Sequence, residues 1–230
     1  PATVSENRVH YTGTLRDNSS YDSDAKPTQA GSYTVTVMCE TADTIYTASA
    51  NFTIYPIDLG DGSHGVGFSS DKITYTGNAE NVSVHPLGPK GSPQMSEGTD
   101  YEISGTVNAT NVGEYTVTIR GIGNNYTGEV SGTWQIIPAP LTITGATVTA
   151  KTYDGSTSAQ VTGVTFTGLQ NNEALELDTD YKVTAAAFND ANVNAANKVT
   201  GTVALKDTET AKNYTLSSAT FEQAANIGKA

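Results

Sequence analysis

The residues with the most evident potential for chemistry lie in the segment DLGDGSHG (58–65), where Asp58, Asp61 and His64 share a glycine-rich loop. Carboxylate oxygens on such a loop are the ligands that Ca²⁺ takes in proteins. Asp58 and Asp61 are therefore candidate ligands of a Ca²⁺ ion, although their spacing matches no EF-hand loop. The alternative interpretation is that they are solvated turn carboxylates, and we predict no other metal site and no other cofactor.

Catalytic arrangements are not evident in the remaining reactive residues. The histidines His10, His64 and His85 show no HExxH spacing, and the chain contains no GxSxG motif. Cys39 is the only cysteine, so it forms no internal disulfide, and we interpret it as a buried or half-buried structural thiol. No pair of acidic residues is singled out for glycoside hydrolysis. We therefore predict that the chain is not an enzyme and has no catalytic residues.

The net charge of −12 argues against several partners. Nucleic acids and anionic membrane surfaces both require clustered lysine and arginine, which this acidic chain does not offer. No run of 18 apolar residues occurs, so no membrane insertion is predicted. The twelve tyrosines, together with many valines and threonines, favour β-strands.

Two nearly identical strings suggest how the strands are built. In GSYTVTV (31–37) and GEYTVTI (113–119), apolar residues alternate with serine, threonine or glutamate. This period of two is typical of a half-buried strand in an antiparallel sheet. Pro56 follows the first string at the same spacing as Pro138 follows the second. Since proline cannot donate a ladder hydrogen bond, both prolines are expected to end a strand and begin a linker.

Further landmarks divide the chain into three predicted modules, covering residues 1–55, 56–138 and 139–230. The landmarks are VHYTGT (9–14), ITYTGN (73–78) and KTYDGS (151–156), then GTDY (98–101) and DTDY (178–181), then NNYTG (124–128) and KNYTL (212–216). The first module lacks the Thr-Asp-Tyr element, so it is either short or truncated. Internal repetition of this kind is typical of arrays of small domains.

The predicted fold class is all-β, with three tandem small antiparallel β-sandwich domains of the Ig-like kind. A β-grasp-like unit is the alternative, but it requires a packed helix that the sequence does not show. The segment NNEALEL (171–177) is expected to form at most one helical turn. Tyr46 and Tyr126 recur at matching positions and are predicted to be buried. The predicted structural core residues are Tyr33, Phe52, Tyr115, Trp134 and Phe221.

Several of these segments resemble repeats of large bacterial cell-surface proteins. The strings KTYDG (151–155), GLQNNEALELDTDY (168–181), KVTGTVALK (198–206) and KNYTL (212–216) resemble the YDG-type repeat. The strings ITYTGN, GTDY, GEYTVTI and NNYTG of the second module resemble the neighbouring Gly-rich surface repeats. The resemblance implies β-domains of an extracellular stalk or adhesin, at the bacterial cell surface or secreted, without catalytic residues.

The leading functional hypothesis is a non-catalytic extracellular stalk or adhesin segment that spaces or presents a binding region of a larger surface protein. The opening residues PATVSENRVHYTG read as the interior of a longer chain, so other domains of the same parent chain are expected partners. One alternative is a module that binds a glycan or a host surface protein. Another is a set of accessory domains of a secreted enzyme. Binding is best sought in HPLGPKGSPQMSEG (85–98), which differs between the modules.

Overall fold

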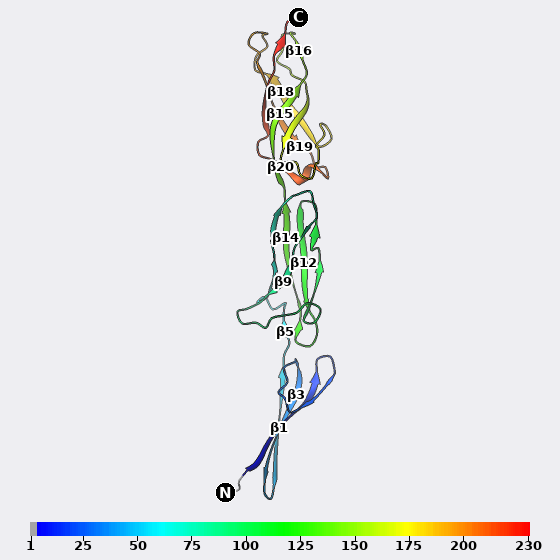
Figure 1. Cartoon of the computed structure of the whole chain (residues 1–230), viewed down its shortest axis with the longest axis vertical. Helices are drawn as coiled ribbons and strands as arrows, with labels where there is room; N and C mark the ends of the chain where they lie inside the picture. The colour runs from blue at the N-terminus through cyan, green and yellow to red at the C-terminus, as the bar shows by residue number, and fades with distance from the viewer. Residues whose placement is uncertain (1–3) are drawn as a thin grey trace. The chain divides into compact units, whose positions relative to one another are not determined.

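The structure, a computed structural model, describes residues 4–230 and is all-β (Figure 1). Over these residues there is no α-helix, and a single 3-10 turn, η1, covers Ala211–Asn213. None of the described residues forms a helix with the length and apolar character needed to cross a bilayer. The chain forms two compact units: unit 1 contains residues up to Ser69, Ser83–Val107 and Thr116–Thr133, and unit 2 contains Ser70–Val82, Asn108–Tyr115 and Trp134–Ala230.

Unit 1 begins with a four-stranded antiparallel sheet, which we call the first sheet. Its strands are β1 (Val4–Leu15), β2 (Ser20–Ser23), β3 (Gly31–Thr41) and β4 (Ile45–Ile54), in the order β2-β1-β3-β4. Aromatic rings cover one end of this sheet. Tyr33 is 2% exposed, stacks on Phe52 at 5.4 Å between ring centroids and meets the edge of Tyr21 at 5.6 Å. Phe52 itself is half-buried.

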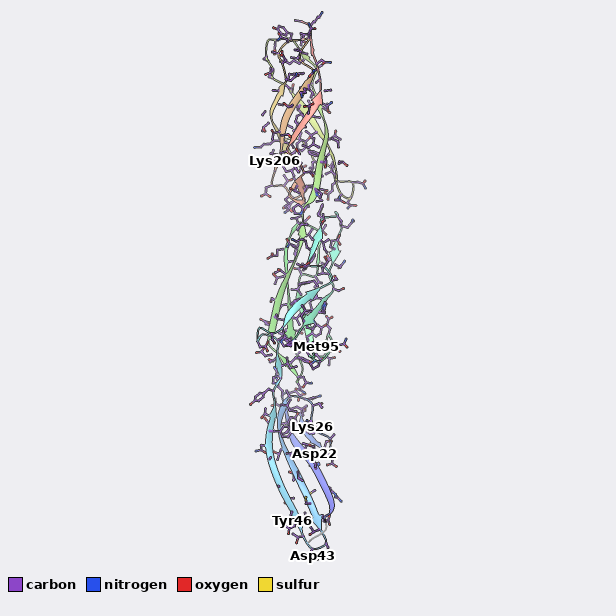
Figure 2. All side chains as sticks on the ribbon, turned by 90° about the vertical axis from the view of Figure 1, so that its left-hand side faces the viewer. Asp22, Lys26, Asp43, Tyr46, Met95 and Lys206 are labelled. Carbon is purple, nitrogen blue, oxygen red and sulfur yellow. The ribbon has the colours of Figure 1, made fainter. Side chains whose placement is uncertain are left out.

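The other end of the first sheet is exposed. Burial fades along β3, from Tyr33 to Val37, which is 38% exposed. Ile45 and Tyr46, the first two residues of β4, are 63% and 61% exposed. Tyr46 is labelled in Figure 2. The prediction that Tyr46 is buried was therefore wrong, because no described element covers this part of the sheet. Tyr126, its counterpart in the sequence, is 5% exposed.

The rest of unit 1 is built from short strands. Strand β6 (Gly65–Phe68) pairs antiparallel with β9 (Val84–Leu87), and β5 (Ile57–Asp58) pairs parallel with β13 (Tyr126–Thr127). Strand β10 (Tyr101–Gly105) pairs antiparallel with β12 (Gly113–Gly121). Strands β12 and β14 (Glu129–Ile137) contribute residues to both units. The core here consists of Leu59, Tyr101, Ile119 and Tyr126.

Unit 2 combines short pairs with two three-stranded sheets. The strands of the sheets are β15 (Ala139–Val148), β17 (Val161–Thr167) and β20 (Tyr214–Leu216), then β18 (Tyr181–Phe188), β19 (Lys198–Leu205) and β21 (Thr220–Ala224). The short strands are β7 (Lys72–Thr74), β8 (Glu80–Asn81), β11 (Asn108–Ala109), β16 (Lys151–Thr152) and β22 (Ile227–Gly228). Side chains of both large sheets, among them Phe166, Tyr181 and Phe221, pack into one core.

The predicted core residues of unit 2 occupy different depths. Trp134 and Phe221 are 1% and 6% exposed, whereas Tyr115 is half-buried and lies against Trp134 with 4.9 Å between ring centroids. The helical turn expected at 171–177 is absent from this segment. The chain instead reverses at Asn171 and Asn172, whose φ values of 48° and 60° lie in the left-handed region that asparagine tolerates. This reversal interrupts any helix at its start.

Candidate functional site

Unit 1 contains a pocket of about 310 Å³ beside the segment that the sequence singles out for binding. Residues 85–95 form much of its wall, and Ile57 and His64 add to it. Met95, which is labelled in Figure 2, is half-buried and packs against the core that contains Tyr101 and Tyr126. The volume lies at the lower end of the range for small-molecule sites in proteins. The pocket therefore accommodates a ligand of modest size.

The deep part of the pocket is apolar with polar tips. Tyr101 and Tyr126 are 6% and 5% exposed, and burial raises the pKa of both phenols, so the hydroxyls remain protonated at neutral pH. Pro86, Pro89 and Pro93 line the outer part. Because proline fixes φ, these three residues restrict the conformations of the wall. The surface thus offers rigid apolar patches beside a few hydrogen-bonding groups.

His64 is a polar residue of the pocket whose side chain is held by neighbouring groups. Its side chain is 7% exposed, and Nδ1 lies 3.2 Å from Oδ1 of Asp61 and 3.0 Å from Oγ of Ser63. A carboxylate only accepts hydrogen bonds, so Nδ1 carries the proton and Nε2 of the neutral ring is an acceptor. A Cβ placed on Gly88 would lie 3.3 Å from Nε2, which locates this nitrogen beside the pocket wall.

Asp61, Ser63 and His64 do not form a catalytic triad. The carboxylate and the hydroxyl both lie next to Nδ1 of His64, whereas a triad needs them on opposite ring nitrogens. Ser63 also donates its hydroxyl and its backbone N–H to Asp61, at 2.6 Å and 2.8 Å. These hydrogen bonds, with a smaller contribution from His64, lower the pKa of Asp61 to about 2. The three residues close and stiffen the turn.

The two Ca²⁺ candidates belong to separate local turns. Oδ1 of Asp58 accepts the N–H of Gly60 at 2.9 Å, and Oδ1 of Asp61 is taken up by Ser63 and His64. Among the described residues, no three histidine, cysteine or acidic side chains gather closely enough to hold one metal ion. The Ca²⁺ hypothesis for Asp58 and Asp61 stays a prediction.

The other residues that the sequence flagged lie outside this pocket or at its rim. Cys39 is half-buried on β3, as interpreted from its place in the strand pattern. His10 on β1 contacts Asp24 through Nδ1 at 2.6 Å and Asp22 through Nε2 at 2.9 Å, and the hydrogen bond that it donates to Asp24 is the main cause of its raised pKa. His85 lines the pocket and is exposed. Of the three histidines, His64 and His85 thus lie at the same pocket and His10 does not.

Sequence reasoning missed a polar contact in unit 2 that involves two buried tyrosines. Glu173 accepts the hydroxyl of Tyr75 at 2.5 Å and the hydroxyl of Tyr214 at 2.6 Å, one on each carboxylate oxygen. The two rings meet edge to face at 5.5 Å. Burial and then Glu173 raise the pKa of Tyr75 to about 12, and the same causes raise that of Tyr214. The signal was that both tyrosines belong to recurring landmarks, ITYTG and NYT.

Comparison with protein families identifies one domain in the chain. The pattern of the YDG domain matches residues 137–221. The matched segment covers β15 to β20 and the first two residues of β21, and therefore most of the two large sheets of unit 2. No curated protein matches the chain at a significant level.

Proposed function

We propose that the chain is a non-catalytic segment of a larger bacterial surface protein, exposed outside the cell, that spaces or presents a binding region. In this proposal, residues 1–55, 56–138 and 139–230 are tandem Ig-like modules, and the YDG match at 137–221 lies almost entirely in the last of them. The localisation and the parent chain follow from the resemblance to surface repeats. The other domains of the parent chain are then its immediate partners.

The observation that supports this proposal best is the structural use of the YDG signature. Lys151 is held by Asp154 at 2.7 Å, Ser156 at 3.1 Å and Ser158 at 3.4 Å, which engages all three ammonium hydrogens. Asp154 accepts both the N–H and the hydroxyl of Ser156, and its pKa falls to about 2, with Lys151 the largest cause. Because Lys151 and Asp154 form their hydrogen bonds within this one turn, we interpret them as residues that stabilise the turn.

The proposal is tested by comparing the purified chain with its parent protein. An antibody raised against residues 1–230 is expected to label intact source cells, with an antibody to a cytoplasmic protein as the permeability control. Labelling only after permeabilisation would contradict the extracellular assignment. Deleting residues 56–138 from the parent protein is expected to reduce cell adhesion, while the purified chain alone adheres poorly. Adhesion by the purified chain equal to that of the parent would replace the spacing role by a binding role.

A glycan-binding module is the second candidate function, and the pocket beside β9 favours it. Sugars present hydroxyl donors and apolar C–H faces, which suit Nε2 of His64 and the surfaces of Met95 and the prolines. We expect the methyl resonance of Met95 to shift when a matching sugar from a panel is added. The shift should be lost in His64→Ala and kept in His10→Ala, whose histidine is on the first sheet. A shift unchanged by His64→Ala would exclude this pocket.

A further inference from the structure

In unit 1, an asparagine turn contacts the first sheet just before β3. Oδ1 of Asn125 accepts the backbone N–H of Ala30 at 2.9 Å, and Ala30 is 1% exposed. The neighbouring Asn124 donates from Nδ2 to Oε1 of Gln29 and to Oδ2 of Asp17, both at 3.1 Å. Its Oδ1 also accepts the N–H of Asp17 at 2.9 Å. The two asparagines therefore satisfy backbone and side-chain groups at one end of the first sheet.

Arg16 reinforces this contact from the other side. Its guanidinium donates to the carbonyl of Tyr126 at 2.6 Å, to the carbonyl of Gly123 at 3.3 Å and to Oγ1 of Thr127 at 3.2 Å. Guanidinium is suited to such a contact because it offers several donors in a fixed geometry. The turn at 123–127 is therefore held to the first sheet in two ways: Arg16 binds its backbone carbonyls, and its own asparagine side chains bind residues before β3.

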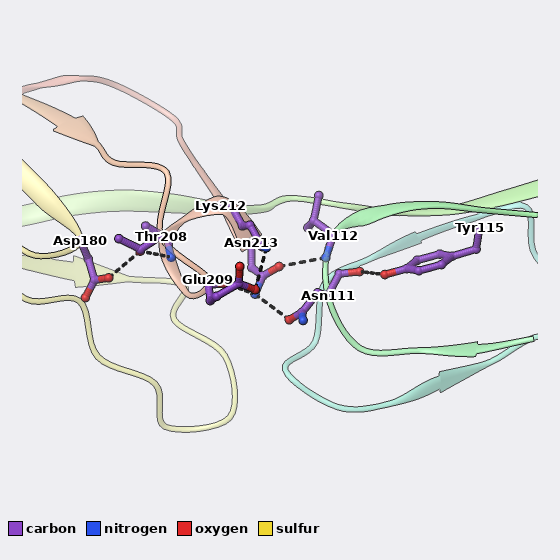
Figure 3. Close-up of polar contacts among 9 residues, drawn as sticks. Asn111, Val112, Tyr115, Asp180, Thr208, Glu209, Lys212 and Asn213 are labelled. Carbon is purple, nitrogen blue, oxygen red and sulfur yellow. Dashed lines mark hydrogen bonds and ion pairs between the residues drawn. The ribbon is translucent and has the colours of Figure 1, made fainter. Parts of the chain in front are cut away.

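Unit 2 contains the same kind of contact just before β12 (Figure 3). Oδ1 of Asn213 accepts the backbone N–H of Val112 at 2.9 Å. Its Nδ2 donates to Oδ1 of Asn111 and to the carbonyl of Glu209, both at 3.1 Å. Asn213 is 2% exposed, so a polar side chain is fully enclosed with both ends of its amide in use. Burial of an amide without such partners would be unfavourable.

The backbone segments that the two asparagines contact lie at equivalent positions, each directly before a Gly-x-Tyr strand. Ala30 precedes GSYTVTV, and Val112 precedes GEYTVTI. In each strand the tyrosine hydroxyl donates back to the carbonyl four residues earlier, from Tyr33 to Gln29 at 2.7 Å and from Tyr115 to Asn111 at 2.6 Å. The side chains of these same two residues also accept an asparagine amide: Gln29 from Asn124, one position before Asn125, and Asn111 from Asn213 itself.

The two asparagines that contact these segments, Asn125 and Asn213, also lie at equivalent positions. Asn125 and Asn213 each precede a buried tyrosine of an Asn-Tyr-Thr string, Tyr126 and Tyr214. Each tyrosine pairs in parallel with the first residue after a linker proline. The two pairs are Ile57 with Tyr126, after Pro56, and Ala139 with Tyr214, after Pro138. In both units, the residue after the linker proline pairs with the tyrosine of the Asn-Tyr-Thr string, and the asparagine before that tyrosine contacts the segment before a Gly-x-Tyr strand.

We infer that the Asn-Tyr-Thr turn and the backbone before a Gly-x-Tyr strand are the two halves of one recurring docking interface, whose partner is another β-module of the same kind. The inference rests on the proposed function only in treating the repeated segments as modules. Asparagine suits the position because its short amide presents an acceptor to the backbone N–H in both contacts, and in Asn213 it also donates to the neighbouring side chain. A hydrophobic residue at this position cannot form the hydrogen bond to the backbone N–H and therefore cannot form the docking interface.

The first sheet contains a natural example of such a replacement. The string DTIYTA (43–48) covers the end of the turn after β3 and the start of β4, with Tyr46 at the tyrosine position and Ile45 where the asparagine would stand. Ile45 has no side-chain acceptor, and both residues are exposed. The docking interface therefore explains why Tyr126 is buried while its sequence counterpart Tyr46 is not.

Amide hydrogen exchange of the full chain tests the inference residue by residue. In Asn125→Ala, the Ala30 amide is expected to exchange at least about tenfold faster while the Val112 amide is unchanged, because one hydrogen bond is lost. Asn213→Ala should give the reverse pattern, so each variant is the matched control of the other. Asn125→Asp, which keeps the accepting oxygen, should keep Ala30 protected.

The contrary outcomes are equally specific. Unchanged exchange at Ala30 in Asn125→Ala, or acceleration of both amides by either variant, would overturn the docking interface. The exchange result does not depend on where the parent protein resides. Failure of surface labelling with the reciprocal exchange pattern intact would therefore refute the proposed function and leave the docking interface standing.

Discussion

Replacing Trp134 by alanine is expected to lower the free energy of unfolding by about 3–5 kcal/mol. Trp134 is 1% exposed and packs against Tyr115, so truncation removes a large apolar surface and leaves a cavity. It is the only tryptophan of the chain, so unfolding in urea has to be followed by circular dichroism. Loss of the ring also frees Tyr115, which holds the carbonyl of Asn111, so protection of the Val112 amide should fall in the same variant.

Tyr55→Ala is the matched control for this aromatic truncation. Tyr55 is 81% exposed, and surface substitutions of this kind change stability by about 0.5 kcal/mol or less. Equal midpoints for Trp134→Ala and Tyr55→Ala would show that the region around Trp134 does not contribute a cooperative core.

Replacing Glu173 by alanine is expected to cost about 2–4 kcal/mol of stability, because two tyrosine hydroxyls lose their shared acceptor. Tyr75 and Tyr214 are 3% and 4% exposed, so water does not readily replace the carboxylate. Glu176→Ala is the matched control, since it removes the same charge from an exposed position of the same segment. Equal losses in the two variants would contradict a structural role for the Glu173 contact.

The same contact makes stability depend on pH in the alkaline range. The pKa of Tyr75 is raised from 10.0 to about 12, and that of Tyr214 is raised as well. Between these values the unfolded chain releases protons that the folded chain retains, so stability is full below pH 10 and falls as pH rises through 12. The slope should be reduced in Tyr75→Phe, where no hydroxyl titrates at that position.

Much of the strand content follows from local pattern alone. The alternation in GEYTVTI correctly places Val117 and Ile119 inside, and both are fully buried. The segments YEISG and YKVTAAAF coincide with β10 and β18. These strands are predictable because period-two patterning and β-branched residues act within a few residues of each other.

Other features depend on contacts with residues that are distant in the sequence, which the local pattern does not reveal. GSYTVTV has the same pattern as GEYTVTI, yet Val37 is exposed because no described element covers its end of the first sheet. The linker expected to begin at Pro138 is limited to that residue, because β14 ends at Ile137 and β15 begins at Ala139, where it pairs in parallel with β20. Glu173 meets Tyr75 from 98 positions away along the sequence. Pairing across such separations is a property of the folded chain.

The candidate pocket was likewise predictable only in part from the sequence. The segment 85–98 was identified because it is unlike the other modules, and residues 85–95 do line the pocket. The position of His64 was not predictable, because it depends on the pairing of β6 with β9, which brings the imidazole beside Gly88.

The outer strand β4 has a practical consequence for every solution measurement. Its sequence, IYTASANFTI, contains neither a charged residue nor a proline, and it forms an edge of the first sheet. Edges of this kind are templates for pairing with another chain unless charge or shape prevents it. Mutual repulsion between chains of net charge −12 opposes such self-association, and added salt screens that repulsion within about 10 Å at 0.1 M. Dilute samples at low ionic strength are therefore the conditions under which the stability and exchange experiments report on single molecules.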